Sequence, residues 1–135
     1  MPRKNFLKIS SFFIFPALVY AFGWFIAIAF DAYNVYAFTD SIMHFLGGLA
    51  IVYTCILFLR FFREKGYMEV NNKALRVLII VSLVALTAVL WEFYEFFMKI
   101  FFQLDYQPSL NDTLLDLVMG LIGGLAGALV FRKIE

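Results

Sequence analysis

Three pairs of ionisable residues stand out in a chain that is otherwise strongly apolar. The pairs are Asp40 with His44, Glu92 with Glu95, and Asp112 with Asp116. Residues three or four positions apart on an α-helix project from the same face, so each pair presents its two side chains together. Carboxylates and an imidazole are suitable ligands for a divalent metal ion, and a carboxylate can also act as a general base. The spacing therefore predicts a metal site or a proton-transfer site.

The single histidine limits the kind of metal site. Di-iron bundles use two Glu-x-x-His motifs, whereas His44 is the only histidine and no glutamate stands three residues before it. A mononuclear site with one imidazole, or an oxygen-rich site, fits this composition, and the candidate ions are Zn, Mn, Mg and Fe. We expect all six residues of the three pairs to be metal ligands. Glu92 and Glu95 are also the expected catalytic residues.

The elements that position these residues are predicted to be membrane-spanning helices. The chain of 135 residues is 64% hydrophobic, which lies far outside the range of soluble domains. Crossing a hydrocarbon core of roughly 30 Å takes about 20 helical residues, and continuous apolar runs of that length cover residues 6–30, 40–62, 74–102 and 112–131. A β-barrel would show short alternating segments instead. The prediction is all-α: an integral membrane four-helix bundle that forms a single transmembrane domain over residues 1–135.

Basic residues indicate the orientation of this bundle. Ten of the eleven precede the first run, lie around the connection between the second and third runs, or follow the fourth: Arg3, Lys4, Lys8, Arg60, Arg63, Lys65, Lys73, Arg76, Arg132 and Lys133. By the positive-inside rule, both the N and C termini are predicted to be cytoplasmic. The first run is too long for the core of a signal peptide, so we expect a retained helix in a multi-pass protein of the cell membrane.

This orientation places the three pairs in one layer. His44 and Asp116 lie one turn inside runs that begin at the outer surface, and Glu92 and Glu95 lie one to two turns before the third run emerges there. Ionisable groups within a span normally face the bundle interior. We therefore expect an acidic cavity in the outer half of the bilayer, facing the outside and enclosed by the second, third and fourth helices, with the first helix as a lipid-facing buttress.

Simpler roles for the same residues stay open. Asp40 and Asp112 lie in first helical turns, where an acid complements the helix dipole. The candidate capping residues of those helices are Thr39, Ser109 and Asn111. Glu95 can pair with Lys99 four residues later. A polar network that only locks the helices together would explain the deeper acids and His44 without any chemistry.

Small residues suggest where helix backbones approach one another. The fourth run contains two overlapping small-xxx-small pairs, Gly120/Gly124 and Gly123/Gly127, and the second run contains Gly47 and Gly48. Such residues let helices pack closely in lipid. The pattern favours packing inside the bundle, and a homo-oligomer seam is the alternative.

Taken together, the three motifs resemble a known family. The segments D-S-I-M-H-F-L-G-G, W-E-F-Y-E-F-F and N-D-T-L-L-D-L-V-M-G-L-I-G-G are similar to those of the YjdF-like group of small prokaryotic membrane proteins and, more distantly, of VanZ-like proteins. The resemblance covers about residues 39–127, and its motifs correspond to the three pairs and Thr113. VanZ-like members are associated with resistance to a lipoglycopeptide antibiotic that acts at the cell surface, so the resemblance implies a role in the cell envelope. Many relatives have more than four helices.

Three functions fit these observations. The first is a metal-dependent enzyme that acts on a lipid or lipid-linked envelope substrate, with Glu92 or Glu95 as general base. The second is a proton- or cation-coupled carrier, although the inner halves of the runs offer almost no polar lining. The third is a non-catalytic membrane scaffold with a structural polar layer. The expected partners are membrane lipids and a lipid-linked substrate, and no basic aromatic patch indicates nucleic acid.

Overall fold

The fold is all-helical, as the sequence predicts. A computed structural model describes residues 9–36, 38–104 and 109–131. The elements are the 3-10 turn η1 (Ser11–Phe13) and the helices α2 (Ile14–Phe30), α3 (Ala32–Val35), α4 (Thr39–Glu64), α5 (Lys73–Phe102) and α6 (Leu110–Val130). The described ranges contain no strand. Residues 6–8 of the first predicted run lie outside them, as do the terminal basic residues Arg3, Lys4, Lys8, Arg132 and Lys133 used to predict orientation.

Four helices are long and apolar enough to cross a membrane, which confirms the predicted number. They comprise Ser11–Phe30, Thr39–Glu64, Lys73–Phe102 and Leu110–Val130, and they contain between 20 and 30 residues each. A rise of about 1.5 Å per residue makes each of them at least about 30 Å long, enough to span the hydrocarbon core. Large apolar side chains cover their outer surfaces. In a bilayer these side chains meet lipid and need no protein partner.

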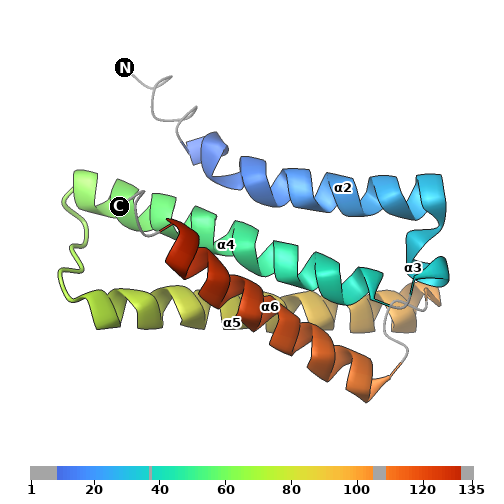
Figure 1. Cartoon of the computed structure of the whole chain (residues 1–135). Coiled ribbons are helices and arrows are strands. Elements are labelled where there is room, and N and C mark those ends of the chain that lie inside the picture. The colour runs from blue at the N-terminus through green and yellow to red at the C-terminus, as the bar shows by residue number, and fades with distance from the viewer. Residues whose placement is uncertain (1–8, 37, 105–108, 132–135) are drawn as a thin grey trace.

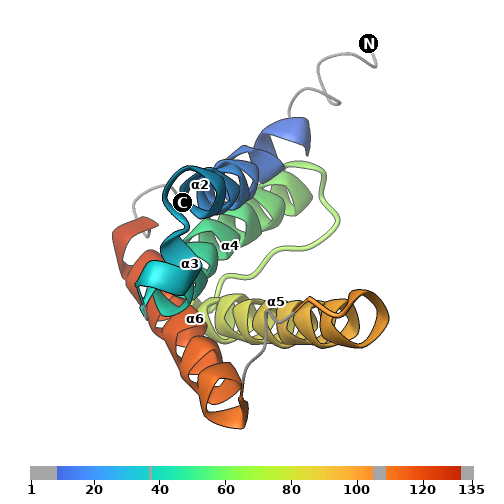
Figure 2. The same ribbon diagram turned by 90° about the vertical axis from the view of Figure 1, so that its right-hand side faces the viewer.

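Helix α4 is the centre of the bundle. It packs against α2, α5 and α6, and α6 crosses both α4 and α5 obliquely (Figures 1 and 2). Helix α2 lies at the periphery and packs mainly along α4, as expected of a buttress. The beginning of α2, the end of α6 and the loop between α4 and α5 lie at one end of the bundle, and α3 lies at the other (Figure 1). We call the second of these the α3 end.

Glycines bring α4 and α6 into backbone contact. A Cβ atom added at Gly48 would collide with the carbonyl oxygen of Gly120, and one added at Gly123 would collide with the carbonyl oxygen of Phe45. Only glycine fits such contacts, so the small residues pack inside the bundle, as the sequence favours. The expectation for Gly47 was wrong, because no atom lies within 4 Å of a Cβ built there. One residue along a helix turns a side chain by about 100°, which aims Gly47 away from α6.

The N-termini of α4 and α6 confirm one of the three predicted capping residues and correct the other two. Ser109 is the N-cap of α6, where its Oγ accepts a hydrogen bond of 3.2 Å from the backbone N–H of Asp112. Asn111 lies inside the first turn of α6 and is not the cap. Thr39 is not a cap either, because it is already the first residue of α4 and its Oγ1 donates a hydrogen bond of 2.9 Å to the carbonyl oxygen of Ala32. That bond ties α3 to the start of α4.

Candidate metal centre

The structure brings the three predicted pairs together at the α3 end of the bundle. Each pair lies near a helix terminus at that end: in the first turns of α4, in the last turns of α5 and in the first turns of α6. Four of the side chains are buried, with exposed fractions of 1% for Asp116, 5% for Glu92, 7% for Glu95 and 9% for His44. The other two, Asp40 and Asp112, are half-buried. The cluster therefore has a buried interior and a more open margin.

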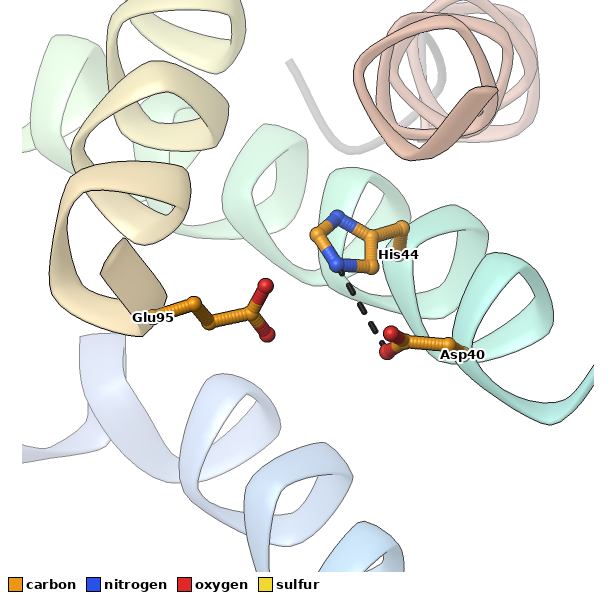
Figure 3. Close-up of side chains that lie close together, drawn as sticks. All are labelled: Asp40, His44 and Glu95. Carbon is orange, nitrogen blue, oxygen red and sulfur yellow. Dashed lines mark ion pairs between the residues drawn. The ribbon is translucent and has the colours of Figure 1, made fainter. Parts of the chain in front are cut away.

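His44 lies between carboxylates from two helices. Its Nε2 atom is 3.7 Å from Oδ1 of Asp40 on α4 and 3.7 Å from Oε1 of Glu92 on α5. Both distances exceed the usual hydrogen-bond range, so the groups converge without bonding directly. Figure 3 shows the side chains of Asp40 and His44 from α4 and of Glu95 from α5 pointing into a common space.

Three overlapping sets of ligand atoms occur within the cluster, and the atoms of each set lie within 4.8 Å of one another. The sets are Asp40–His44–Glu95, His44–Glu92–Asp116 and Asp40–Asp112–Asp116. Only the second is fully buried, and it takes one residue from each of α4, α5 and α6. We call His44, Glu92 and Asp116 the buried triad.

Hydrogen bonds satisfy only part of the buried triad. Oδ1 of Asp116 on α6 accepts a hydrogen bond of 2.9 Å from the hydroxyl of Ser41 on α4. Among the described residues, no group forms a hydrogen bond with the other carboxylate oxygen of Asp116, Oδ2, or with Nε2 of His44. Buried polar atoms almost always have a partner, so two such atoms facing one cluster point to a ligand there.

Two polar partners in this layer were not predicted from the sequence. Ser41 lies inside the D-S-I-M-H motif, but its type does not predict a partner on another helix, because a serine in an apolar helix usually bonds to its own backbone. Trp91 donates a hydrogen bond of 2.8 Å from its indole Nε1 to Oε1 of Glu95. The four-residue spacing of Trp91 and Glu95 was the available signal, since such residues share a helix face.

Tyr33 on α3 adds a third unpredicted neighbour at the margin of the cluster. Burial first, and then the nearby carboxylates of Asp40 and Glu95, raise the pKa of its phenol to about 12. The phenol therefore remains protonated at neutral pH and can donate a hydrogen bond. Tyr33 therefore places a neutral hydrogen-bond donor near the carboxylates of Asp40 and Glu95.

The charge of the cluster requires compensation. Five carboxylates and a single imidazole share one small volume, and like charges cannot all persist there without protons, water or cations. The geometry fits a cation, because two ligands about 2.1 Å from a tetrahedral ion are about 3.4 Å apart. The 3.7 Å separations around His44 are close to that value.

Apolar packing closes the bundle beyond the cluster. Val52, Ile56, Ile80 and Val84 are buried together with Cys55 between α4 and α5, farther from the α3 end. Gly124 and Gly127 of α6 pack directly on Val84 and Val52. The buried acids and His44 therefore lie toward the α3 end, and the described residues of this core cluster are all apolar.

Comparison with known proteins identifies a family. A family model described as "Predicted membrane protein (DUF2238)" matches residues 3–135. This match fits the YjdF-like resemblance, and the likeness to VanZ-like proteins is not shown by it. No curated protein and no solved structure matches the chain.

Proposed function

The chain belongs to this family of predicted membrane proteins, and we propose that it is a metal-dependent enzyme whose buried triad holds one divalent ion. One observation carries the proposal. Ligand atoms of His44, Glu92 and Asp116, which come from three helices, lie within 4.8 Å of one another at a buried point. Two of these residues, His44 and Asp116, also carry the buried atoms Nε2 and Oδ2 that lack a hydrogen-bond partner among the described residues. A divalent ion there would offset the excess of negative charge.

The donor set favours some ions over others. One imidazole with two carboxylates suits Zn, Mn or Fe, whereas Mg prefers oxygen ligands alone. The Asp40–Asp112–Asp116 set at the margin is purely carboxylate and is the better match for Mg. An ion in the buried triad would supply Lewis acidity toward a phosphate or carbonyl oxygen.

Glu95 is the proposed general base, and Glu92 is assigned to the metal. Glu95 lies outside the buried triad but within 4.8 Å of the ligand atoms of His44 and Asp40. Its hydrogen bond from Trp91 engages Oε1, and its side chain points toward Asp40 and His44 (Figure 3). A base must lie within reach of the proton it removes while the ligands hold the ion. Glu92 is then the metal ligand and Glu95 the general base, whereas the sequence alone assigns both roles to both residues.

A lipid or lipid-linked substrate fits the position of the site. The cluster lies inside helices that are long and apolar enough to span a membrane, so a substrate held in the bilayer can approach it laterally. The half-buried residues Asp40 and Asp112 mark the margin from which a polar headgroup would enter. Lys99 lies in the last turn of α5, toward the α3 end. The other five described basic residues lie at the opposite end, which supports a site facing the outside under the positive-inside rule: Arg60, Arg63, Lys65, Lys73 and Arg76.

A non-catalytic scaffold is the second candidate, and two observations favour it. The bonds from Ser41 to Asp116 and from Trp91 to Glu95 are of the kind that lock helices and side chains in place. A carrier has weaker support, because transport needs a polar path to the other side, whereas the buried core of α4 and α5 beyond the cluster is apolar.

Thermal unfolding in detergent, with and without added Zn²⁺ or Mn²⁺, separates the enzyme from the scaffold. A ligand at 100 times its dissociation constant stabilises the folded state by about 2.7 kcal/mol, so the wild type should unfold at a higher temperature with the ion. Glu92→Gln should lose this response, whereas the control Glu69→Gln in the exposed α4–α5 loop should retain it. A scaffold predicts no response to the ion in any of the three proteins.

A second assay tests catalysis itself. Hydrolysis of lipid phosphate esters in mixed micelles should depend on the ion and should be lost in Glu95→Gln, while that variant keeps its thermal response to the ion. Loss of both properties together would assign Glu95 to the metal and would contradict its role as base.

A further inference from the structure

A pocket at the end of the bundle opposite the candidate metal centre combines positive charge with an apolar floor. Arg60 and Arg63 of α4 and Arg76 of α5 line it, together with apolar side chains that include Ile56, Leu59 and Val70. We call it the arginine pocket. The proposed enzyme uses none of these residues.

We propose that the arginine pocket binds the phosphate headgroup of an anionic membrane phospholipid. A guanidinium group presents a planar set of five N–H donors, which matches a phosphate in a bidentate fashion. Three arginines from two helices line the one pocket. The apolar floor would contact the glycerol and the first methylene groups of the acyl chains.

Local contacts orient the arginines. Nη2 of Arg76 donates a hydrogen bond of 2.8 Å to the carbonyl oxygen of Val70, which fixes its side chain against the loop. Nε of Arg60 lies 3.3 Å from Oε1 of Glu64, one turn along α4. That carboxylate offsets part of the charge, but the segment 60–76 still holds five basic and two acidic residues, a net charge of +3. The surroundings therefore favour an anion.

The position of the pocket favours a lipid over a free anion. It lies where α4 ends and α5 begins, at the ends of two helices long and apolar enough to span a membrane, which is where spanning segments are expected to meet lipid headgroups. Ile56 is 97% buried and continues the floor toward the apolar core. Basic pockets between spanning helices are suited to acidic headgroups at this depth. Free phosphate would gain nothing from the apolar floor.

Lipid retention tests the proposal on the full-length protein. The purified chain is equilibrated with mixed micelles that contain equal amounts of phosphatidylglycerol and phosphatidylcholine, and bound lipid is counted by native mass spectrometry. The variant Arg60→Gln/Arg63→Gln removes two pocket charges. Lys65→Gln/Lys73→Gln is the matched control, because it removes two charges from the same end of the bundle at residues outside the pocket lining.

The wild type and the lysine control should retain phosphatidylglycerol in preference to phosphatidylcholine. In the arginine variant this preference should fall by at least about fivefold, the effect expected when a cation near a membrane surface is removed. An equal loss of this preference in both variants would show that the total charge at this end of the bundle attracts the lipid, and would overturn the proposal that the arginine pocket binds it. Displacement of the lipid by an equal concentration of inorganic phosphate would overturn its assignment to a phospholipid. Neither result would affect the metal centre at the opposite end.

Discussion

The hydroxyl of Ser41 on α4 donates a hydrogen bond of 2.9 Å to Oδ1 of Asp116 on α6. It links two of the helices that enclose the candidate metal centre, and Asp116 is 1% exposed. Ser41→Ala should lower the free energy of unfolding by about 1–3 kcal/mol, because a buried acceptor loses its donor. Chemical unfolding in detergent measures the loss. Thr87→Ala is the control, since that exposed hydroxyl bonds only to its own helix, and equal effects of the two substitutions would contradict the structural role of Ser41.

The glycine contact between α4 and α6 makes a sharper prediction, because Gly47 and Gly48 are neighbours with opposite surroundings. A methyl group at Gly48 would collide with the backbone of α6, whereas one at Gly47 would meet no atom within 4 Å. Gly48→Ala should lower the free energy of unfolding by about 1–3 kcal/mol or more. Gly47→Ala should be neutral or stabilise the protein by up to about 1 kcal/mol, since alanine favours the helix. A reversed order in unfolding experiments would rule out this packing.

Trp91 is expected to act on catalysis through Glu95. Trp91→Phe keeps an aromatic ring but removes the indole N–H that holds the carboxylate. Ion-dependent activity should fall by about 10–100-fold, as for other groups that orient a catalytic or ligating side chain. Metal content should stay unchanged, because Glu95 is outside the buried triad. Trp24→Phe, on the exposed face of α2, should leave both quantities unaltered, and an equal loss of activity there would dismiss the specific role of Trp91.

Tyr33 provides a test based on pH. Its pKa is raised to about 12 by burial and by the carboxylates of Asp40 and Glu95. A raised pKa in the folded state means that the stability contributed by the protonated phenol is present below about pH 10 and is lost as the pH rises toward 12. The difference in phenolate absorbance between wild type and Tyr33→Phe should therefore titrate near 12. Asp40→Asn should lower the midpoint of that titration toward 10. An unchanged midpoint would show that the charge of Asp40 does not act on the Tyr33 phenol.

The fold and the clustering of the acidic pairs could be predicted because both follow from periodicity. Continuous apolar runs set the four helices, and spacings of three and four residues put Asp112 with Asp116 and Glu92 with Glu95 on single faces. Successive spanning helices run in opposite directions, so the helix ends that carry the pairs fall in one layer. None of these steps requires knowledge of how one helix rotates against another.

The remaining details depend on that rotation. Gly48 faces α6 and Gly47 does not, a difference of one residue that composition does not reveal. Thr39 follows an irregular connection, so its bond to Ala32 across α3 replaced the expected cap. Ser41 bonds to a residue on another helix, and its type alone does not indicate such a partner.

The central claim is that His44, Glu92 and Asp116 hold one divalent ion. Elemental analysis of the purified chain tests it most directly, after exchange into metal-free buffer and readdition of Zn²⁺, Mn²⁺ or Fe²⁺ followed by removal of the excess. The account predicts a stoichiometric ion in the wild type and in Glu69→Gln, and its loss in both Glu92→Gln and Asp116→Asn while these variants remain folded. Equal metal content in all four proteins, or none in the folded wild type, would contradict the account.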